Sequence, residues 1–243
     1  MPVLISSYIE QFHIFMEQIE KNWTALRARI NLACEQARRD PDEIEVVAVG
    51  KTRTADEIRA VAERGLTVVG ENRVQEADGK IAVLSEGIIW HLIGHLQRNK
   101  AKRAVALFEM IQSVDSLRVA RALDLQAGEV QKTQDVLLQV NTSGEQSKFG
   151  VSPTAANELA AGVANLNNLK VRGLMTIGAH SENKSKIRAS FRGLREVREQ
   201  LREMPGVDMS ILSMGMSGDF ELAISEGANM IRLGTALFGP RKA

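Results

Sequence analysis

Residues 44–51 read Ile44-Glu45-Val46-Val47-Ala48-Val49-Gly50-Lys51, a short apolar run that ends in a glycine and a lysine. Several runs of this kind in the chain lack polar alternation, which is typical of strands covered on both faces in a parallel sheet. Seven further runs follow the first. They span residues 66–69, 88–93, 110–114, 136–140, 171–177, 209–214 and 230–233.

Helix-like stretches separate these runs, among them residues 55–64, 116–126, 153–164 and 184–203. Strand–helix alternation repeated about eight times predicts either a closed (β/α)8 barrel or an open, doubly wound sheet. The barrel (the TIM barrel) is favoured because the number of runs suits it and no dinucleotide-binding glycine motif follows the first run. No linker or low-complexity tract interrupts the alternation, so we expect a single domain over residues 1–243.

The first 38 residues predict one long amphipathic helix. Its apolar residues recur at every third or fourth position, which places them on one side of the helix. The pattern ends at Asp40-Pro41, because proline lacks the backbone donor that a helix interior needs. We expect residues 1–38 to pack outside the barrel; a coiled coil with a second chain is the alternative, although the pattern lasts only about three heptads. The apolar residues are Tyr8, Phe12, Phe15, Ile19, Trp23, Leu26 and Ile30.

The composition excludes several classes of protein. The 31 Lys+Arg and 30 Asp+Glu residues almost balance, which argues against a nucleic-acid-binding protein. The lone Cys34 cannot form an internal disulfide, so we expect a reducing compartment, the cytoplasm. The N-terminus shows no signal peptide, and no apolar run approaches the roughly 18 residues of a membrane span. A basic cluster over residues 98–103 is interpreted as a solvated helix face.

Lys51 is the first candidate for chemistry, because ligands of parallel α/β folds bind beyond the carboxyl ends of the strands. A desolvated lysine is a nucleophile suited to Schiff-base formation with carbonyl compounds. The alternative is structural: Lys51 caps a carboxylate such as Glu57 or simply reaches solvent.

The loops after the seventh and eighth runs are the second candidate. They contain Ser217 within Met214–Gly218 and Thr235 within Arg232–Thr235. In barrels of this type these two loops often bind phosphate through hydroxyls and backbone amides. Ordinary turn chemistry is the alternative for each loop taken alone. Arg232 can only donate hydrogen bonds, either to a ligand or to a carboxylate inside the barrel.

Several segments of the chain resemble the pyridoxal phosphate homeostasis protein family. The most specific of them is WHLIGHLQRNK at residues 90–100. The resemblance runs from about residue 25 to the C-terminus; Gly50 stands where many members have serine. The other matching segments are VAVGKT (47–52), GEN (70–72), GLM (173–175), LSMGMS (212–217) and IRLGTALFG (231–239).

The resemblance implies a fold-type III, alanine-racemase-like barrel that holds pyridoxal 5′-phosphate (PLP) as a Schiff base on Lys51. It implies that Arg232 faces the pyridine nitrogen, that Asn72 lines the ring pocket, and that Met175 packs near the cofactor. It also implies a role in intracellular vitamin B6 homeostasis, with PLP-dependent apoenzymes as candidate partners. The residues that would hold the phosphate are Ser217, Gly234 and Thr235.

A PLP-dependent amino-acid racemase is the alternative function. Racemisation needs acid–base groups on both faces of the substrate carbon. In alanine racemases the second base is a tyrosine from a C-terminal domain of a partner subunit, whereas this sequence ends at Ala243 and its only tyrosine is Tyr8. We therefore expect a monomeric cofactor carrier or regulator with little or no turnover and no catalytic residue. A barrel that binds a phosphorylated metabolite without pyridoxal chemistry is a third hypothesis.

No metal site is expected. His91 and His95 are four residues apart, a spacing that suits a shared metal only on a helix. The apolar residues around them predict a strand, along which four residues span about 13 Å. His91 is therefore interpreted as a packed, hydrogen-bonded strand residue near the cofactor.

Overall fold

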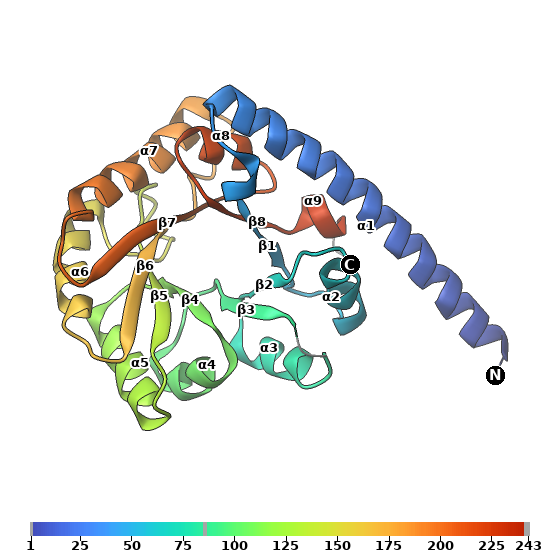
Figure 1. Cartoon of the computed structure of the whole chain (residues 1–243), viewed down its shortest axis with the longest axis horizontal. Helices are drawn as coiled ribbons and strands as arrows, with labels where there is room; N and C mark the ends of the chain where they lie inside the picture. Colours follow the sequence, from blue (N-terminus) through green and yellow to red (C-terminus); the bar gives the residue numbers. More distant parts are fainter. Residues whose placement is uncertain (1, 85–86, 241–243) are drawn as a thin grey trace.

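Eight parallel strands close into a barrel, each paired with its neighbours in the order of the chain (Figure 1). The computed structural model describes residues 2–84 and 87–240, without the side chains of residues 2–12. The predicted (β/α)8 barrel is confirmed, and the open doubly wound sheet is excluded because β1 also pairs with β8. The strands are β1 (Glu45–Val49), β2 (Val68–Glu71), β3 (Ile89–Leu92), β4 (Met110–Val114), β5 (Gln134–Gln139), β6 (Leu169–Met175), β7 (Val207–Met216) and β8 (Met230–Leu233).

Helices connect the strands around the outside of the barrel (Figure 1). Capping residues mark several of their beginnings: Thr54 and Glu57 form a reciprocal capping box at the start of the first connecting helix. None of the described helices is long and apolar enough to traverse a lipid bilayer. The helices are α1 (Pro2–Ala37), α2 (Ala55–Ala62), α3 (Val74–Ile81), α4 (Ala101–Leu107), α5 (Leu117–Glu129), α6 (Ala156–Ala164), α7 (Lys184–Leu201), α8 (Phe220–Ser225) and α9 (Thr235–Phe238), with single 3-10 turns at Pro41–Glu43, Arg98–Lys100 and Pro153–Ala155.

The barrel has two apolar layers, because successive strand residues point to opposite faces of a sheet. One small cluster fills the barrel interior, and a larger one lies between the sheet and the helices. Around β1 and β2, therefore, Val47 belongs to the inner layer, whereas Val69 belongs to the outer layer. The inner cluster consists of Val47, Val68, Met110, Leu137, Met175 and Met230.

Helix α1 lies across the outside of the barrel against α8 and α9 (Figure 1). The helix after β8, α9, has only four residues, so α1 supplies most of the cover near the seam between β1 and β8. The side chain of Asn22 donates a hydrogen bond to the carbonyl of Leu237 at 2.8 Å. Of the predicted apolar stripe, Ile19, Leu26 and Ile30 are buried and Phe15 and Trp23 are partly buried; the side chains of Tyr8 and Phe12 lie outside the described part of the chain.

The predicted strand bounds differ from the structure by one or two residues at several strands. The predicted runs at 136–140 and 171–177 both start two residues too late, since β5 begins at Gln134 and the second residue of β6 is Lys170. The second run was also placed too early: β2 continues through Gly70 to Glu71. Gly70 belongs inside the barrel, because a Cβ there would lie 2.8 Å from Val47 and 2.9 Å from Ile93.

Candidate functional site

Lys51 follows β1 directly and lies in the turn that leads into α2. The turn is closed by a hydrogen bond from the Arg53 amide to the Gly50 carbonyl at 2.9 Å. Thr52 has a φ of 63°, a left-handed conformation that is unfavourable for a β-branched residue. The Lys51 side chain is half-buried, and among the described residues it makes no ion pair or hydrogen bond. Its amine is therefore available for a ligand.

A cleft of about 460 Å³ opens beside Lys51. We call it the Lys51 cleft. Asn72, from the loop after β2, lines the same cleft, so the structure brings these two predicted residues together. Other lining residues are Gly94, His95, Lys100 and Phe149.

Gly94 allows the loops after β2 and β3 to approach each other closely. A Cβ on Gly94 would lie 2.3 Å from the carbonyl oxygen of Asn72 and 2.7 Å from its Cα. A side chain at this position would push Asn72 away. The glycine in the family-like segment 90–100 therefore shapes one wall of the Lys51 cleft.

Ser217 and the start of α9 form the second group of predicted residues. The Ser217 hydroxyl oxygen accepts hydrogen bonds from the backbone amides of Gly234 at 3.3 Å and Ala236 at 3.2 Å. These amides, with the hydroxyls of Ser217 and Thr235, are the donor types that bind phosphate in barrel proteins. A Cβ on Gly234 would lie 3.5 Å from Val49, two residues before Lys51, so this group lies near the strand end that carries the lysine.

Arg232 points into the barrel interior and is almost completely buried. Its guanidinium donates to the Ser213 hydroxyl at 2.6 Å and to the Thr176 carbonyl at 2.7 Å. Burial lowers the pKa of Arg232 to about 10, while the nearby Asp219 charge acts in the opposite direction. Arg232 makes no direct ion pair with a carboxylate among the described residues, so the sequence-based alternative of a barrel carboxylate partner is not found there.

A chain of buried side chains continues from Arg232 across the barrel. The Ser213 hydroxyl donates to Gln112 Oε1 at 2.6 Å, and Gln112 Nε2 lies 2.9 Å from His91 Nδ1. His91 lies on β3, as predicted, and burial lowers its pKa to about 4, so its imidazole is neutral at neutral pH. Because Gln112 Nε2 is a donor, the neutral His91 ring accepts at Nδ1 and carries its proton on Nε2. Sequence analysis missed Gln112 and Ser213, because both belong to apolar strand runs.

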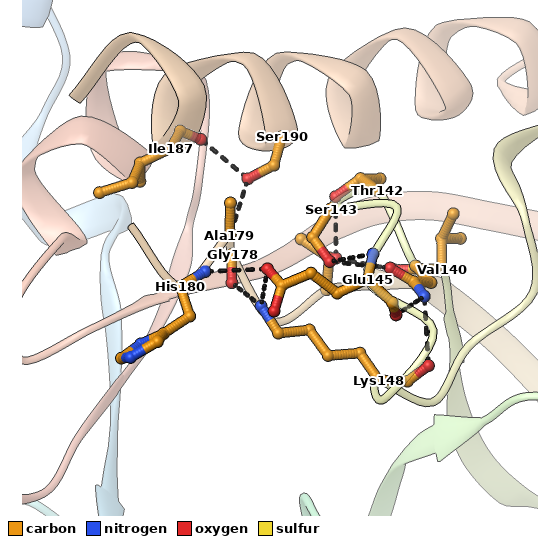
Figure 2. A network of polar contacts seen from close by, with 12 residues as sticks. Val140, Thr142, Ser143, Glu145, Lys148, Gly178, Ala179, His180, Ile187 and Ser190 are labelled. Atoms are coloured by element: carbon orange, nitrogen blue, oxygen red, sulfur yellow. Dashed lines mark hydrogen bonds and ion pairs between the residues drawn. The ribbon is translucent and has the colours of Figure 1, made fainter. Parts of the chain in front are cut away.

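The loops after β5 and β6 meet in a polar network at the same end of the barrel (Figure 2). Lys148 Nζ lies 2.8 Å from Glu145 Oε1 and donates to the Gly178 carbonyl at 2.6 Å. The Glu145 carboxylate also accepts from the backbone amide of His180 at 3.0 Å. These contacts hold the pKa of Glu145 below its usual range, chiefly through the hydrogen bond from Lys148. In the same two loops, Thr142 Oγ1 lies 3.0 Å from Thr176 Oγ1.

The same β5–α6 loop reaches the Lys51 cleft through Phe149. The ring of Phe149 stacks on the imidazole of His95 with centroids 3.8 Å apart. His95 Nδ1 in turn lies 3.1 Å from Asp115 Oδ2. His91 and His95 thus have separate partners, and the described residues contain no cluster of side chains suited to a metal ion.

The six predicted residues fall into three neighbouring groups at the carboxyl end of the barrel. Lys51 and Asn72 share one cleft, Ser217 binds the amides at the start of α9, and Arg232 lies below in the interior. Thr235 is exposed beside Gly234. Met175 is buried in the inner apolar cluster of the barrel.

Comparison with known proteins gives the class of protein first. The family model described as alanine racemase, N-terminal domain, matches residues 16–242. The chain belongs to the pyridoxal phosphate homeostasis protein family, whose curated members include close relatives of it. The Aquifex aeolicus member is 43% identical over 215 residues, covering 88% of this chain and 94% of the relative. The Pseudomonas aeruginosa member is 41% identical over 227 residues, covering 93% of this chain and 97% of the relative.

A solved structure supports the same assignment. The structure of PipY from Synechococcus elongatus with PLP bound is 36% identical to this chain and superposes with a TM-score of 0.79. The match covers 91% of this chain and all of PipY. The barrel of this chain is therefore similar to that of a relative that contains PLP.

Proposed function

We propose that this chain binds pyridoxal 5′-phosphate as a Schiff base on Lys51 and serves intracellular PLP homeostasis with little or no turnover. The observation that carries the proposal is Lys51 itself. It is a half-buried lysine at the end of β1, on a cleft, with no hydrogen bond or ion pair to the described residues. A lysine held in this way is suited to attack on a carbonyl group.

The other residues fit the cofactor by their chemistry. The Ser217 hydroxyl and the amides of Gly234 and Ala236 lie within hydrogen-bond distance of one another and would bind an anion, with Thr235 beside them. Asn72 lines the cleft that contains Lys51. PipY, a relative at 36% identity, is named as containing PLP. We assign Lys51, Asn72, Ser217, Arg232, Gly234 and Thr235 to cofactor binding.

The cofactor would supply an aldehyde that condenses with an amine. The Lys51 amine would attack the aldehyde carbon; a C=N bond would replace the C=O bond and one water molecule would leave, so no oxidant or reductant would be needed. Arg232 would face the pyridine nitrogen. Because a guanidinium only donates hydrogen bonds, it leaves that nitrogen unprotonated and weakens the ring as an electron acceptor. This is our reason for proposing little or no turnover.

Hydride trapping tests the binding proposal. The purified protein is incubated with PLP, its visible absorption spectrum is recorded, and borohydride reduction is followed by peptide mapping. We expect the label on the peptide that contains Lys51, and no label there in Lys51→Ala. Lys100→Ala is the matched control, because Lys100 lines the same cleft and should leave the label unchanged. A label on another lysine, or none, would contradict the proposal.

An amino-acid assay tests the absence of turnover. The PLP-loaded protein is incubated with L-alanine and other L-amino acids, and the products are separated by chiral chromatography. We expect no D-isomer above the level given by free PLP. Sustained formation of a D-amino acid would instead identify a racemase.

We further propose that residues 1–243 act as one domain, monomeric in the cytoplasm, and that the chain delivers PLP to apoenzymes. The lone cysteine, Cys34, is buried, which suits a reducing compartment but does not require it. Light scattering measures the mass of the species in solution. Mixing the loaded protein with a PLP-dependent apoenzyme measures delivery, which we expect to outpace release of PLP into buffer.

A further inference from the structure

A partly buried cluster of one cation and two carboxylates contacts the turn that carries Lys51. Lys80 Nζ is 2.7 Å from Glu71 Oε1 and 2.9 Å from Glu76 Oε1. Glu71 is the last residue of β2, and Glu76 and Lys80 lie one turn apart on α3. Glu71 is completely buried and the Lys80 side chain is nearly so. None of these residues is among those that line the Lys51 cleft.

This cluster binds the backbone on both sides of Lys51. Lys80 Nζ donates to the carbonyl oxygen of Gly50 at 2.8 Å. The backbone amide of Thr52 donates to Glu76 Oε1 at 2.6 Å. Gly50 and Thr52 are therefore both hydrogen-bonded to the same ion-paired cluster, whereas Lys51, which lies between them, makes no hydrogen bond or ion pair with it.

The backbone of this turn needs such support. Thr52 adopts a left-handed φ of 63°, which costs free energy in a β-branched residue and persists only where neighbouring groups hold it. The hydrogen bond from the Thr52 amide to Glu76 is one of the contacts that hold this conformation. Removing that hydrogen bond would allow the turn to relax toward a more favourable conformation and would carry Lys51 with it.

Gly50 shows how closely Glu71 packs under the turn. A Cβ on Gly50 would lie 2.6 Å from Glu71 Oε1 and 3.1 Å from Ile58 Cδ1. The carboxylate therefore occupies the space that a side chain at position 50 would need. Lys80, which donates to the Gly50 carbonyl, is held there by the carboxylates of both Glu71 and Glu76.

The charges around Lys80 come from two elements. Burial raises the pKa of Glu71 to about 7, although the hydrogen bond and charge of Lys80 oppose this. The pKa of Glu76 lies below its usual range: burial acts to raise it, but the hydrogen bonds from Lys80 and Thr52 and the charges of Lys80 and Arg73 together outweigh burial. Glu76 therefore stays ionised when Glu71 takes up a proton, and Lys80 keeps an anionic partner.

We propose that Lys80, together with Glu76, is a positioning residue for Lys51: it fixes the peptide groups on either side of Lys51 so that the amine is presented to the cleft. Its expected effect on the rate of Schiff-base formation rests on the proposed function. The restraint on the backbone is independent of any cofactor and can be measured without one.

Two pairs of variants test the proposal. Lys80→Met removes the cation, whereas Lys80→Arg keeps a donor for Gly50. Glu76→Leu removes the acceptor for the Thr52 amide, whereas Glu76→Gln keeps an oxygen there. Lys102→Met, on the exposed surface of α4, controls for loss of a lysine elsewhere. The first readout is hydrogen exchange of the Thr52 amide in cofactor-free protein, and the second is the rate of borohydride-trapped labelling of Lys51 by PLP.

We expect the Thr52 amide to exchange about tenfold faster in Lys80→Met and Glu76→Leu, and Lys51 to be labelled about tenfold more slowly, because a displaced nucleophile loses reactivity steeply. In Lys80→Arg and Glu76→Gln, the exchange rate of the Thr52 amide and the labelling rate of Lys51 should both lie close to the wild-type values. Lys102→Met should change neither rate. Should Lys80→Met not fold, the Glu76 pair gives the same test. If the Thr52 amide exchanges and Lys51 is labelled in Glu76→Leu at the wild-type rates, the proposal is overturned. If the wild-type protein is not labelled at Lys51, the proposed function fails, while the exchange data still decide whether the turn is held.

Discussion

The hydroxyl oxygen of Ser217 lies 3.3 Å from the backbone nitrogen of Gly234, which joins the loop after β7 to the loop after β8. Helix α9 begins directly after this contact. The two loops that we assign to the phosphate are thus held together by a residue that would also bind it.

Replacing Ser217 tests this double role. We expect Ser217→Ala to weaken PLP binding about tenfold, because a hydrogen bond to a charged group is lost and the α9 amides lose their partner. Equilibrium titration, followed by absorbance, measures the dissociation constant. Ser225→Ala is the control: Ser225 is an exposed serine at the end of α8 and should leave the affinity unchanged. Equal affinities for the two variants would remove Ser217 from the site.

Gly94 offers a test of cleft geometry. We expect Gly94→Ala to lower the free energy of unfolding by about 1–3 kcal/mol, because the new methyl group would meet the Asn72 carbonyl oxygen. Urea unfolding measures this change. Gly79→Ala, in α3, has no atom within 4 Å of its new Cβ and should be neutral or stabilising by up to about 1 kcal/mol. A Gly94 variant as stable as the wild type would show that the loops can separate without cost.

Glu71 should make stability fall as the pH rises. Its pKa in the folded protein is about 7, above the ordinary value of 4.5, so the folded state binds a proton more tightly than the unfolded state. Its contribution is fully present below about pH 4.5 and is lost as the pH rises through 7, by up to about 3 kcal/mol. We expect Glu71→Gln to reduce this fall between pH 5 and pH 8, measured by urea unfolding. Glu63→Gln, at an exposed carboxylate, should keep the wild-type slope.

His91 should make the free energy of unfolding fall as the solution becomes acidic. Burial lowers its pKa from 6.5 to about 4, so the unfolded state takes up a proton at a higher pH than the folded state. Stability is therefore present above about pH 6.5 and is lost as the pH falls through 4, by up to about 3 kcal/mol. His91→Asn, which keeps an acceptor for Gln112, should flatten this loss between pH 6.5 and pH 4.5. The exposed His180→Asn should not, and equal slopes in the two variants would contradict this account.

The barrel was predictable because each strand is a short apolar run and the runs recur regularly. The exact bounds were not, since β5 begins with a polar residue, Gln134, which is buried and donates to the Glu109 carbonyl. Helix α8, with six residues, is too short to show a helical period.

The positions of candidate site residues were predictable where a single segment of sequence contains both the strand end and the motif. Lys51 and Ser217 stand at strand ends and within recognisable motifs, and the structure places both at the carboxyl end of the barrel. The connection from Arg232 through Ser213 to Gln112 was not predictable: Ser213 and Gln112 are 101 residues apart and meet only because the barrel closes. Glu71 lies two residues beyond the predicted run at 66–69, and nothing local indicated that it ends β2 or pairs with Lys80.

The long helix at the start of the chain has a consequence for how the protein is made. The hydrogen bond between Asn22 and Leu237 joins residues 215 positions apart, so the helix can meet α9 only after the strands between them have been made, whereas Glu20 pairs with Arg64, only 44 positions away. Contacts between residues so far apart in the chain form slowly. The contacts of this helix near residue 64 can therefore form during synthesis, and its contacts with α8 and α9 follow later.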